Sequence, residues 1–306
     1  MSDVAPEHDL PVEVVVVNYN AGRLLVDCVA SAVAAAATRI IIVDNASADA
    51  SLSEVEQAFP QARIRILRQQ ENLGFARACN IGLQASCAPY VLFLNPDSHL
   101  EPDALRQLLE VLASDEQVGM VGGLLLNPDG SEQAGGRRLF PTPRRAFARA
   151  FGILQLQRRF PQTFPDFLLH QQALPTQPVR VEAISGACML VRRQQLIDLG
   201  GWDEGYFLHC EDLDLCMRYW RQHRAVVFVP TARIIHHQGS CSKAHAWRVE
   251  WYKHRGMLRF YGKFFADSQS SSKMALLTAG VVLRFCLVSL RLGWLRLGWL
   301  RLRPRP

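Results

Sequence analysis

The sequence predicts an α/β fold in which a mostly parallel sheet is flanked by helices and followed by a C-terminal helical tail. Residues 12–17 read VEVVVV and residues 39–43 read RIIIV. Continuous β-branched runs of this kind are typical of strands that are buried on both faces of a parallel sheet. Helical patterns alternate with the runs at short spacing, which is the order expected for a doubly wound sheet.

The remaining elements follow from the same periodicities. The helix predicted over 102–114, for example, places leucines 105, 108, 109 and 112 on one face. Residues 128–178 are rich in Pro, Arg and Gln and are interpreted as an irregular, variable insertion, and SQSSS at 268–272 as a linker. The predicted strands are 12–17, 39–43, 62–67, 90–94, 119–126, strands within 179–192, 225–229 and 233–236, and the predicted helices are 21–37, one from about 49, 75–85, 102–114, 211–223 and 244–265.

We expect one domain over residues 1–267, with a nucleotide-binding half of about 12–126 and an acceptor-binding, catalytic half of about 179–267. Residues 268–306 form a basic, apolar tail. The net charge of +6 arises there, because Asp267 is the last acidic residue and seven Lys and Arg follow it. The nearly neutral body argues against a nucleic-acid partner.

The cysteines and the N-terminus indicate a cytoplasmic protein. None of the 8 cysteines belongs to a C-x-x-C pair, and several lie in apolar segments, as reduced core thiols do. Residues 1–11 lack the apolar core of a signal peptide. A reducing, cytosolic location is the expectation.

Polar clusters follow three of the predicted strands, at 18–20, 44–45 and 95–97. Ligand sites of open α/β sheets lie at the carboxyl ends of the strands. Each cluster alone is also compatible with ordinary turn chemistry, because Asn, Asp and Pro are frequent in turns. Three clusters at neighbouring strand ends together favour a binding site.

Five segments carry a family resemblance when they are taken in order. They are IIIVDNASADAS at 40–51, ENLGFARACNIGL at 71–83, YVLFLNPD at 90–97, GGWDEGYFLHCEDLDLCMR at 200–218 and HHQGSCS at 236–242. The set resembles family 2 glycosyltransferases, and within them the bacterial rhamnosyltransferase-like branch, over roughly residues 12–260. The resemblance implies a GT-A fold and a nucleotide-sugar donor.

The resemblance also implies which residues bind the nucleotide. Asp44 is expected to accept a hydrogen bond from the N3–H of uracil or thymine, although a carboxylate there also suits a turn cap. Asn72 and Asn80 flank the loop that approaches the nucleotide in the family. Asn18 and Asn95 are the remaining candidates, Asn95 towards the ribose or a metal.

A divalent metal, Mg²⁺ or Mn²⁺, is implied at residues 95–97. Asn95 replaces the first acid of the family's D-x-D element, so Asp97 is the remaining carboxylate ligand. His236 and His237 end a predicted strand, where adjacent side chains point to opposite faces, and His236 is the favoured ligand. A lone histidine is otherwise more often structural.

The acidic pair Glu211-Asp212 is implied to supply the general base of an inverting transfer. We assign the base to Asp212 and a supporting or acceptor-binding role to Glu211, which helical spacing pairs with Arg218. The alternative is that these acids only favour the helix N-terminus. Trp202 and Asp203 are candidates for acceptor binding, with core packing an equal alternative for Trp202.

Residues 274–302 combine Leu, Trp and Arg, which suits the boundary of a membrane surface. The longest charge-free stretch, 274–283, is ten residues, shorter than the ~20 of a membrane span. Packing on the domain or on another subunit is the first alternative, and a short transmembrane hairpin or span is a second, less favoured one. The expected location is therefore cytoplasmic and peripheral, on the inner face of the bacterial plasma membrane.

Together these features predict an inverting glycosyltransferase of bacterial surface-polysaccharide synthesis. It moves a sugar, with L-rhamnose as the best single choice, from a dTDP- or UDP-sugar to a saccharide or polyprenyl-linked acceptor. A GT-A nucleotidyltransferase is an alternative, but residues 18–22 do not form the Gly-rich, basic loop that a triphosphate needs. A non-catalytic membrane adaptor is disfavoured by Asp97, Asp212 and His236 occurring together.

Overall fold

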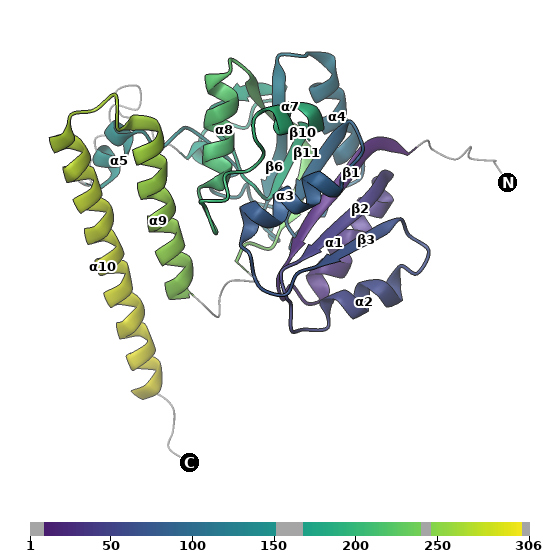
Figure 1. The fold of residues 1–306 in the computed structure, drawn as a ribbon, viewed down its shortest axis with the longest axis horizontal. Helices are drawn as coiled ribbons and strands as arrows, with labels where there is room; N and C mark the ends of the chain where they lie inside the picture. The colour runs from purple at the N-terminus through teal and green to yellow at the C-terminus, as the bar shows by residue number, and fades with distance from the viewer. Residues whose placement is uncertain (1–8, 151–167, 240–245, 302–306) are drawn as a thin grey trace. The chain divides into compact units, whose positions relative to one another are not determined.

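A computed structural model of the chain describes residues 9–150, 168–239 and 246–301, and side chains within these ranges except 147–150 and 294–301. The chain divides into two compact units (Figure 1). The first comprises Met1–Phe140, Leu168–Phe207 and Glu211–Cys241. The second comprises Pro141–Phe167, Leu208–Cys210 and Ser242–Pro306.

A nine-stranded sheet forms the centre of the first unit, in the order β3-β2-β1-β4-β10-β6-β11-β5, with β8 also paired to β11. The strands β1 to β4 are mutually parallel, as their continuous Val and Ile runs predict. Their bounds are β1 Leu10–Asn18, β2 Ala37–Asp44, β3 Ile64–Arg68, β4 Tyr90–Leu94, β5 Ser98–Leu100, β6 Val118–Leu126, β8 Val179–Val181, β10 Cys188–Arg192 and β11 Ala225–His236.

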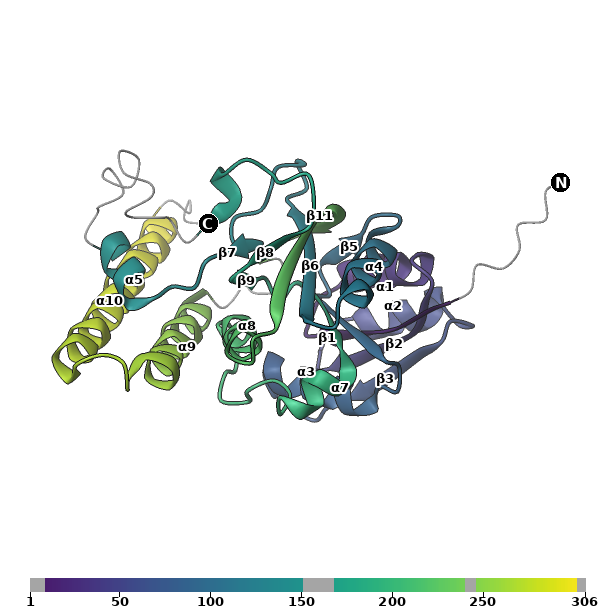
Figure 2. The same cartoon turned by 90° about the horizontal axis from the view of Figure 1, so that it is seen from above.

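Helices cover both faces of this sheet, and Figure 2 shows α1, α2 and α4 on one side with α3, α7 and α8 on the other. Their apolar stripes bury the inner strands, so that Val14, Ile42 and Leu92 have no exposed surface. The bounds are α1 Arg23–Ala34, α2 Ser51–Ala58, α3 Phe75–Ala85, α4 Ala104–Ser114, α7 Arg193–Asp198 and α8 Glu211–Arg221, with a short 3-10 helix at Leu169–Gln171.

The main differences from the predicted elements lie in the strands. β10, β8 and β5 run antiparallel to their neighbours, so the sheet is mixed. β11 is one continuous strand, whose pairing with β6 shifts between Val229 and Arg233, and this irregularity accommodates Pro230 inside a strand. Residues 128–178, predicted to be irregular, contain β7 (Arg137–Arg138), which pairs with β9 (Ala183–Ile184) in a second, two-stranded sheet.

The second unit contains three described helices, α5 (Pro143–Ala150), α9 (Ala246–Phe265) and α10 (Ser271–Arg301). α10 begins inside the predicted linker. Its half-buried and buried side chains recur at helical spacing and include Leu277, Val281 and Phe285. The Phe285 ring contacts Trp247, Trp251 and His254 of α9 at centroid distances of 5.7, 5.5 and 5.4 Å.

The opposite side of α10 is apolar and open. Within the part of the chain that the structure describes, Ser271–Gly293 is the one helical segment long and apolar enough to cross a membrane, by length and composition, and only 6% of its apolar window is buried. Exposed leucines account for much of this surface. They are Leu276, Leu283, Leu287 and Leu290.

Candidate active site at the carboxyl edge of the sheet

The three predicted polar clusters lie side by side in the fold. β1 sits between β2 and β4, and Asn18 pairs in register with Asp44. Asn95 follows the last residue of β4 directly. The prediction that these strand ends are neighbours is confirmed, because consecutive parallel strands bring their carboxyl ends to the same edge.

A buried network organises the first two strand ends. The Asn18 amide donates to Asp44 Oδ1 at 2.8 Å and to Ser51 Oγ at 2.9 Å. The backbone N–H of Ser47 donates to Asp44 Oδ2 at 3.2 Å. Asn18 is fully buried and Asp44 is 3% exposed. Asp44 therefore orders the turn before α2, and its contact with a nucleotide base stays a prediction.

Asn72 and Asn80 hold backbone rather than an open pocket. Asn72 Oδ1 accepts the N–H of Gly74 at 3.0 Å. The Asn80 amide donates to the Trp202 carbonyl and to Glu204 Oε1, both at 2.9 Å, while its oxygen accepts the Trp202 N–H at 2.8 Å. Both amide hydrogens of Asn80 are thus used inside the protein, which favours a role in positioning the loop around Trp202.

Asp97 and His236 meet where β4 and β11 end. His236 Nε2 lies 3.2 Å from Asp97 Oδ1, and the Asn95 amide nitrogen lies 3.4 Å from the same ring nitrogen. The side chains of Asp97 and His236 are 8% and 7% exposed. His237 meets Asp97 differently, because its backbone N–H donates to the Asp97 carbonyl at 2.9 Å.

Gln133 fixes the orientation of the His236 ring. Its Oε1 lies 2.6 Å from His236 Nδ1, while its amide donates to the carbonyls of His236, at 3.1 Å, and of the Asn127 side chain, at 3.0 Å. In this arrangement His236 Nδ1 carries a proton that it donates to Gln133 Oε1, and Nε2 is directed towards Asp97. Nε2 and a carboxylate oxygen both accept hydrogen bonds, so a proton or a cation belongs between them.

The donor set suits one divalent metal only in part. A carboxylate, an imidazole and the nearby Asn95 are acceptable ligands for Mn²⁺ or Mg²⁺. Among the described residues, no group of three or more His, Cys, Asp or Glu is arranged to hold a metal. A cation bound by Asp97 and His236 would therefore need further ligands from substrate or water.

The acidic residues of α8 occupy its first turn, where the helix dipole favours negative charge. Glu211 is 6% exposed, and its Oε2 is buried without a hydrogen-bond partner among the described residues. Burial raises the pKa of the Glu211 carboxyl to about 8, and the neighbouring charge of Asp212 adds to this rise. Burial therefore favours the protonated, neutral form of the Glu211 carboxyl.

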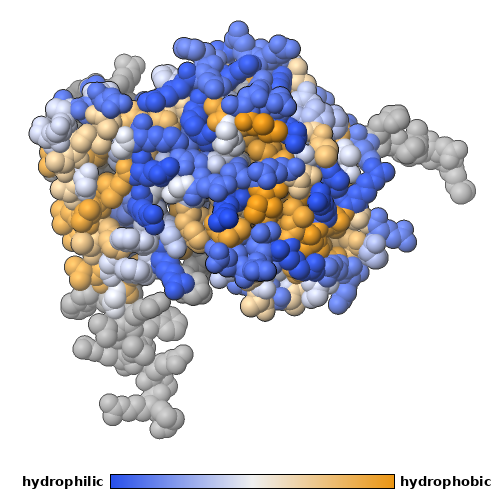
Figure 3. Space-filling model, in the orientation of Figure 1, coloured by the Kyte–Doolittle hydropathy of each residue, from blue (hydrophilic) through white to orange (hydrophobic). Residues whose placement is uncertain are grey.

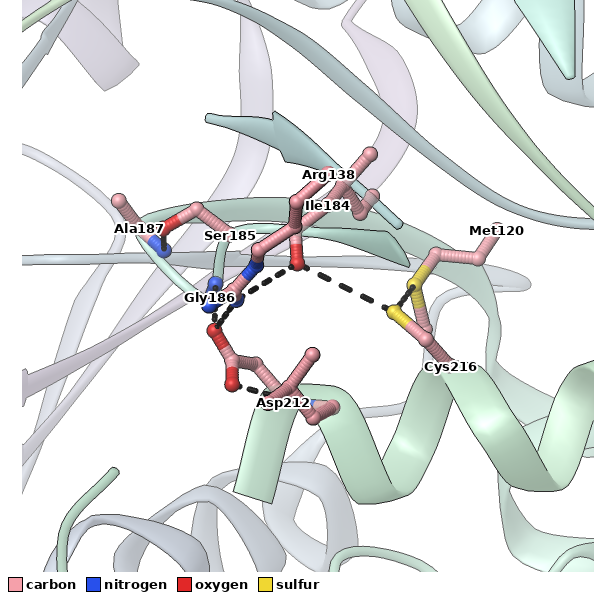
Figure 4. Close-up of polar contacts among 9 residues, drawn as sticks. Met120, Arg138, Ile184, Ser185, Gly186, Ala187, Asp212 and Cys216 are labelled. Atoms are coloured by element: carbon pink, nitrogen blue, oxygen red, sulfur yellow. Dashed lines mark hydrogen bonds and ion pairs between the residues drawn. The ribbon is translucent and has the colours of Figure 1, made fainter. Parts of the chain in front are cut away.

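Asp212 has a different environment. Its Oδ2 accepts the backbone N–H of Gly186 at 3.2 Å and forms an ion pair with Arg138, and its Oδ1 accepts the N–H of Leu213 at 2.7 Å (Figure 4). The expected pairing of Glu211 with Arg218 is wrong. Arg218 binds Asp214 Oδ1 at 2.6 Å, because these two residues are also one helical turn apart.

A single turn connects the two acidic centres. The N–H of Gly186 contacts Asp212, and the carbonyl of the next residue, Ala187, accepts the N–H of Asn95 at 3.0 Å. Successive Cα atoms are about 3.8 Å apart, so the Asp212 carboxylate and Asn95, the residue after β4, border the same short piece of chain. A Cβ at Gly186 would lie in ordinary van der Waals contact with Asp212 Cβ, at 3.4 Å.

Trp202 is part of the core. It is 1% exposed, and its ring makes edge contacts with Phe75 and Phe93 at centroid distances of 5.6 and 5.1 Å. A sugar cannot stack on a ring that is covered in this way, so the predicted acceptor contact of Trp202 is not supported and the packing alternative holds. Asp203 is half-buried and accepts the N–H of Gly205 at 2.9 Å.

Sequence reasoning missed Gln133 and Arg138. Both belong to the segment 128–178, which the sequence predicts to be an irregular insertion, yet they contact His236 and Asp212. No local pattern distinguishes them, because the sequence around them, SEQAGGRR, is polar and Gly-rich like a surface loop. Only the long-range contacts reveal their place.

Comparison with known proteins assigns the chain to a protein family. The family described as "Glycosyltransferase like family 2" matches residues 8–253. The chain belongs to this family. The resemblance drawn from the five motifs is thereby confirmed, and the protein is an enzyme of the glycosyltransferase class.

Individual relatives agree with this assignment. The chain is 30% identical over 251 residues to N-acetylglucosaminyl-diphospho-decaprenol L-rhamnosyltransferase of Mycobacterium tuberculosis, covering 78% of this chain and 77% of that protein. It is 27% identical over 176 residues to rhamnosyltransferase WbbL of Escherichia coli, covering 53% and 59%.

A solved structure supports the fold. Mannosyltransferase PcManGT from Pyrobaculum calidifontis, in complex with GDP-Man and Mn²⁺, matches with a TM-score of 0.57 at 16% identity, covering 91% of this family 2 glycosyltransferase and 71% of that chain. The predicted GT-A type of α/β fold is confirmed.

Proposed function

We propose that this family 2 glycosyltransferase transfers a sugar with inversion from a dTDP- or UDP-sugar to a saccharide or polyprenyl-linked acceptor in bacterial cell-surface polysaccharide synthesis. L-Rhamnose is the sugar that its relatives favour, because two of them are named rhamnosyltransferases. The observation that carries the proposal is the Gly186–Ala187 turn, which contacts Asp212 on one side and the strand end beside Asp97 on the other.

The donor would bind at the ends of β1, β2 and β4. Asp44 is the proposed acceptor for the imide N–H of the base, since a carboxylate suits that donor. Asn18 holds Asp44 in place through its 2.8 Å hydrogen bond, and the loop after β3, with Asn72, would approach the nucleotide. Asn95 is the proposed contact to the ribose or to the cation.

Asp97 and His236 are the proposed ligands of a divalent cation. Their 3.2 Å approach, with Nε2 turned away from Gln133, supports this role. When bound, the cation would neutralise charge on the leaving diphosphate. The diphosphate itself would complete the coordination that two protein side chains leave open.

Asp212 is the proposed general base. It would take the proton of the acceptor hydroxyl while that oxygen forms a bond to the anomeric carbon, and the bond from this carbon to the diphosphate would break on the opposite face. Glu211 differs in having a carboxyl whose pKa is raised to about 8 by burial. It would support the site as a neutral hydrogen-bond donor while Asp212 accepts the proton.

The test is turnover by the purified full-length chain with a panel of nucleotide sugars, with and without Mn²⁺ or Mg²⁺. We expect transfer from a dTDP- or UDP-sugar, and loss of at least about 100-fold in kcat for Asp212→Asn with donor affinity unchanged. Absence of turnover with every donor of the panel would refute the proposed reaction. Full turnover by Asp212→Asn would refute only the base assignment.

We also propose that α10 binds the cytoplasmic membrane surface. Its exposed leucines, Leu276, Leu283, Leu287 and Leu290, recur at helical spacing, and Figure 3 shows hydrophobic surface on the α10 side of the second unit. Arg284 and Arg291 are exposed beside them, which suits anionic lipid headgroups. Because α10 packs on α9, which carries charges such as Arg248, Lys253 and Arg259, the pair would lie in the interface rather than cross it.

Vesicle sedimentation tests this surface. The full-length protein should sediment with anionic vesicles, and Leu283→Gln/Leu287→Gln should sediment less. Leu174→Gln is the matched control, because Leu174 is an exposed leucine of the first unit, and it should bind like the wild type. Equal binding by the double variant would contradict the docking face.

A further inference from the structure

Arg138 is the unexpected neighbour of the acidic pair. It lies on β7, 74 residues before Asp212, and its guanidinium forms an ion pair with Asp212 Oδ2. The same Nη2 atom also donates to the Ile184 carbonyl at 3.2 Å. The side chains of Arg138 and Asp212 are 19% and 13% exposed, so the ion pair is largely removed from solvent.

The backbone around Arg138 is itself held in register. β7 pairs antiparallel with β9, and Arg138 lies opposite Ala183. Ile184, which accepts the guanidinium hydrogen bond, is the next residue of β9. The turn that follows provides Gly186, whose N–H reaches the same carboxylate oxygen. One small sheet and its turn therefore deliver two donors to one oxygen of Asp212.

This arrangement leaves one side of the carboxylate available. A carboxylate accepts about four hydrogen bonds. Oδ2 receives the two donors from Arg138 and Gly186, whereas Oδ1 receives only the N–H of Leu213 within the described part of the chain. Figure 4 shows Arg138 and Gly186 close to Oδ2 of Asp212, while Oδ1 is turned towards the start of α8.

We propose that Arg138 is the positioning residue of this site, which clamps Oδ2 so that Oδ1 of Asp212 faces the acceptor hydroxyl. The inference rests on the proposed role of Asp212 as the base. A planar guanidinium can donate to a carbonyl and a carboxylate in a set direction, which the point charge of a lysine cannot reproduce. Without the clamp the carboxylate rotates about its side-chain bonds, and the productive geometry becomes one of several.

A purely structural ion pair is the competing explanation. It would stabilise the fold, and its loss would lower the melting temperature without a specific effect on the chemical step. A contact to the donor diphosphate is the second competitor, because arginine binds phosphate well. Each explanation predicts a different combination of kcat, donor affinity and stability, so the three can be separated.

The experiment compares Arg138→Gln and Arg138→Lys with the wild type in the full-length chain. We expect kcat to fall about 10- to 100-fold in Arg138→Gln and less in Arg138→Lys, with the donor dissociation constant unchanged within about twofold. Arg233→Lys is the matched control, because Arg233, on β11, forms a salt bridge with Glu101 at 2.9 Å. This variant should have the kcat of the wild type. An unchanged or raised kcat in a folded Arg138→Gln protein would overturn the proposal, as would a loss of donor affinity that accounts for the whole effect.

A crystal structure of Arg138→Gln gives a readout that does not depend on activity. The Asp212 carboxylate should leave its wild-type orientation or occupy more than one. A carboxylate unchanged in position would overturn the proposal. If the wild type transfers no sugar at all, the proposed function fails, and the orientation of Asp212 in the variant still decides whether Arg138 positions it.

Discussion

Glu211→Gln should remove a titration that is coupled to folding. The Glu211 carboxyl is buried next to Asp212, and its pKa rises from the ordinary 4.5 to about 8. Other charges nearby, those of Asp214 and Arg138, raise and lower this pKa respectively. The unfolded chain releases the proton near the ordinary value, so folded and unfolded protein bind different numbers of protons between the two.

The sign and size of the effect follow from this difference. The folded protein holds the extra proton, so the free energy of unfolding decreases as pH rises from 4.5 to about 8 and is constant above. At about 1.4 kcal/mol per pKa unit, the whole shift corresponds to about 5 kcal/mol. Glutamine is uncharged at every pH, so Glu211→Gln lacks this loss.

Urea unfolding of both proteins at several pH values measures the difference. Between about pH 5 and pH 8.5 the variant should gain about 4 kcal/mol relative to the wild type. Glu110→Gln, at an exposed position of α4, is the control and should follow the wild-type profile. Parallel pH profiles for the wild type and Glu211→Gln would show that burial does not raise the pKa of the Glu211 carboxyl. Glu211 would then not be neutral in the folded protein.

Three further substitutions test the metal pair and the aromatic core. Gln133→Ala should weaken Mn²⁺-dependent donor binding about 10- to 100-fold, because the His236 ring loses its hydrogen-bond partner, and Asp97→Ala should weaken it further. Calorimetric titration with and without Mn²⁺ measures the donor affinity of both variants. An unchanged affinity would contradict the assignment of Asp97 and His236 as metal ligands. Trp202→Ala should cost about 3–5 kcal/mol of unfolding free energy in urea titrations, whereas a stable variant with a raised acceptor KM would restore the sugar-stacking role.

Local sequence patterns were sufficient for the half of the sheet that β1 to β4 form. α3 and β4 have the predicted bounds, 75–85 and 90–94, and β1 and β2 differ from theirs by one to two residues. Runs of Val and Ile have few alternatives to a buried strand, and short connections make successive strands neighbours. The adjacency of Asn18, Asp44 and Asn95 follows from these two rules.

The second half of the sheet could not be predicted in the same way. The direction of β10 depends on how the chain returns to β4 after a long excursion, which periodicity does not encode. Trp202 shows the same limit at the level of one side chain: an aromatic after two glycines suits a sugar or a core equally, and only its covering by Phe75 and Phe93 decides.

By itself, the sequence determined the fold class, the glycosyltransferase family and the edge of the sheet that carries the polar side chains. These follow from short-range periodicity and from motifs whose spacing is local. Only the tertiary structure decided the partners of those side chains: Gln133 for His236, Arg138 for Asp212 and Asp214 for Arg218. The physical reason is that hydrogen-bond and ion-pair partners are selected by distance in space. Two of these three partners, Gln133 and Arg138, come from the polar, Gly-rich start of the segment 128–178, which carries no local pattern that marks them.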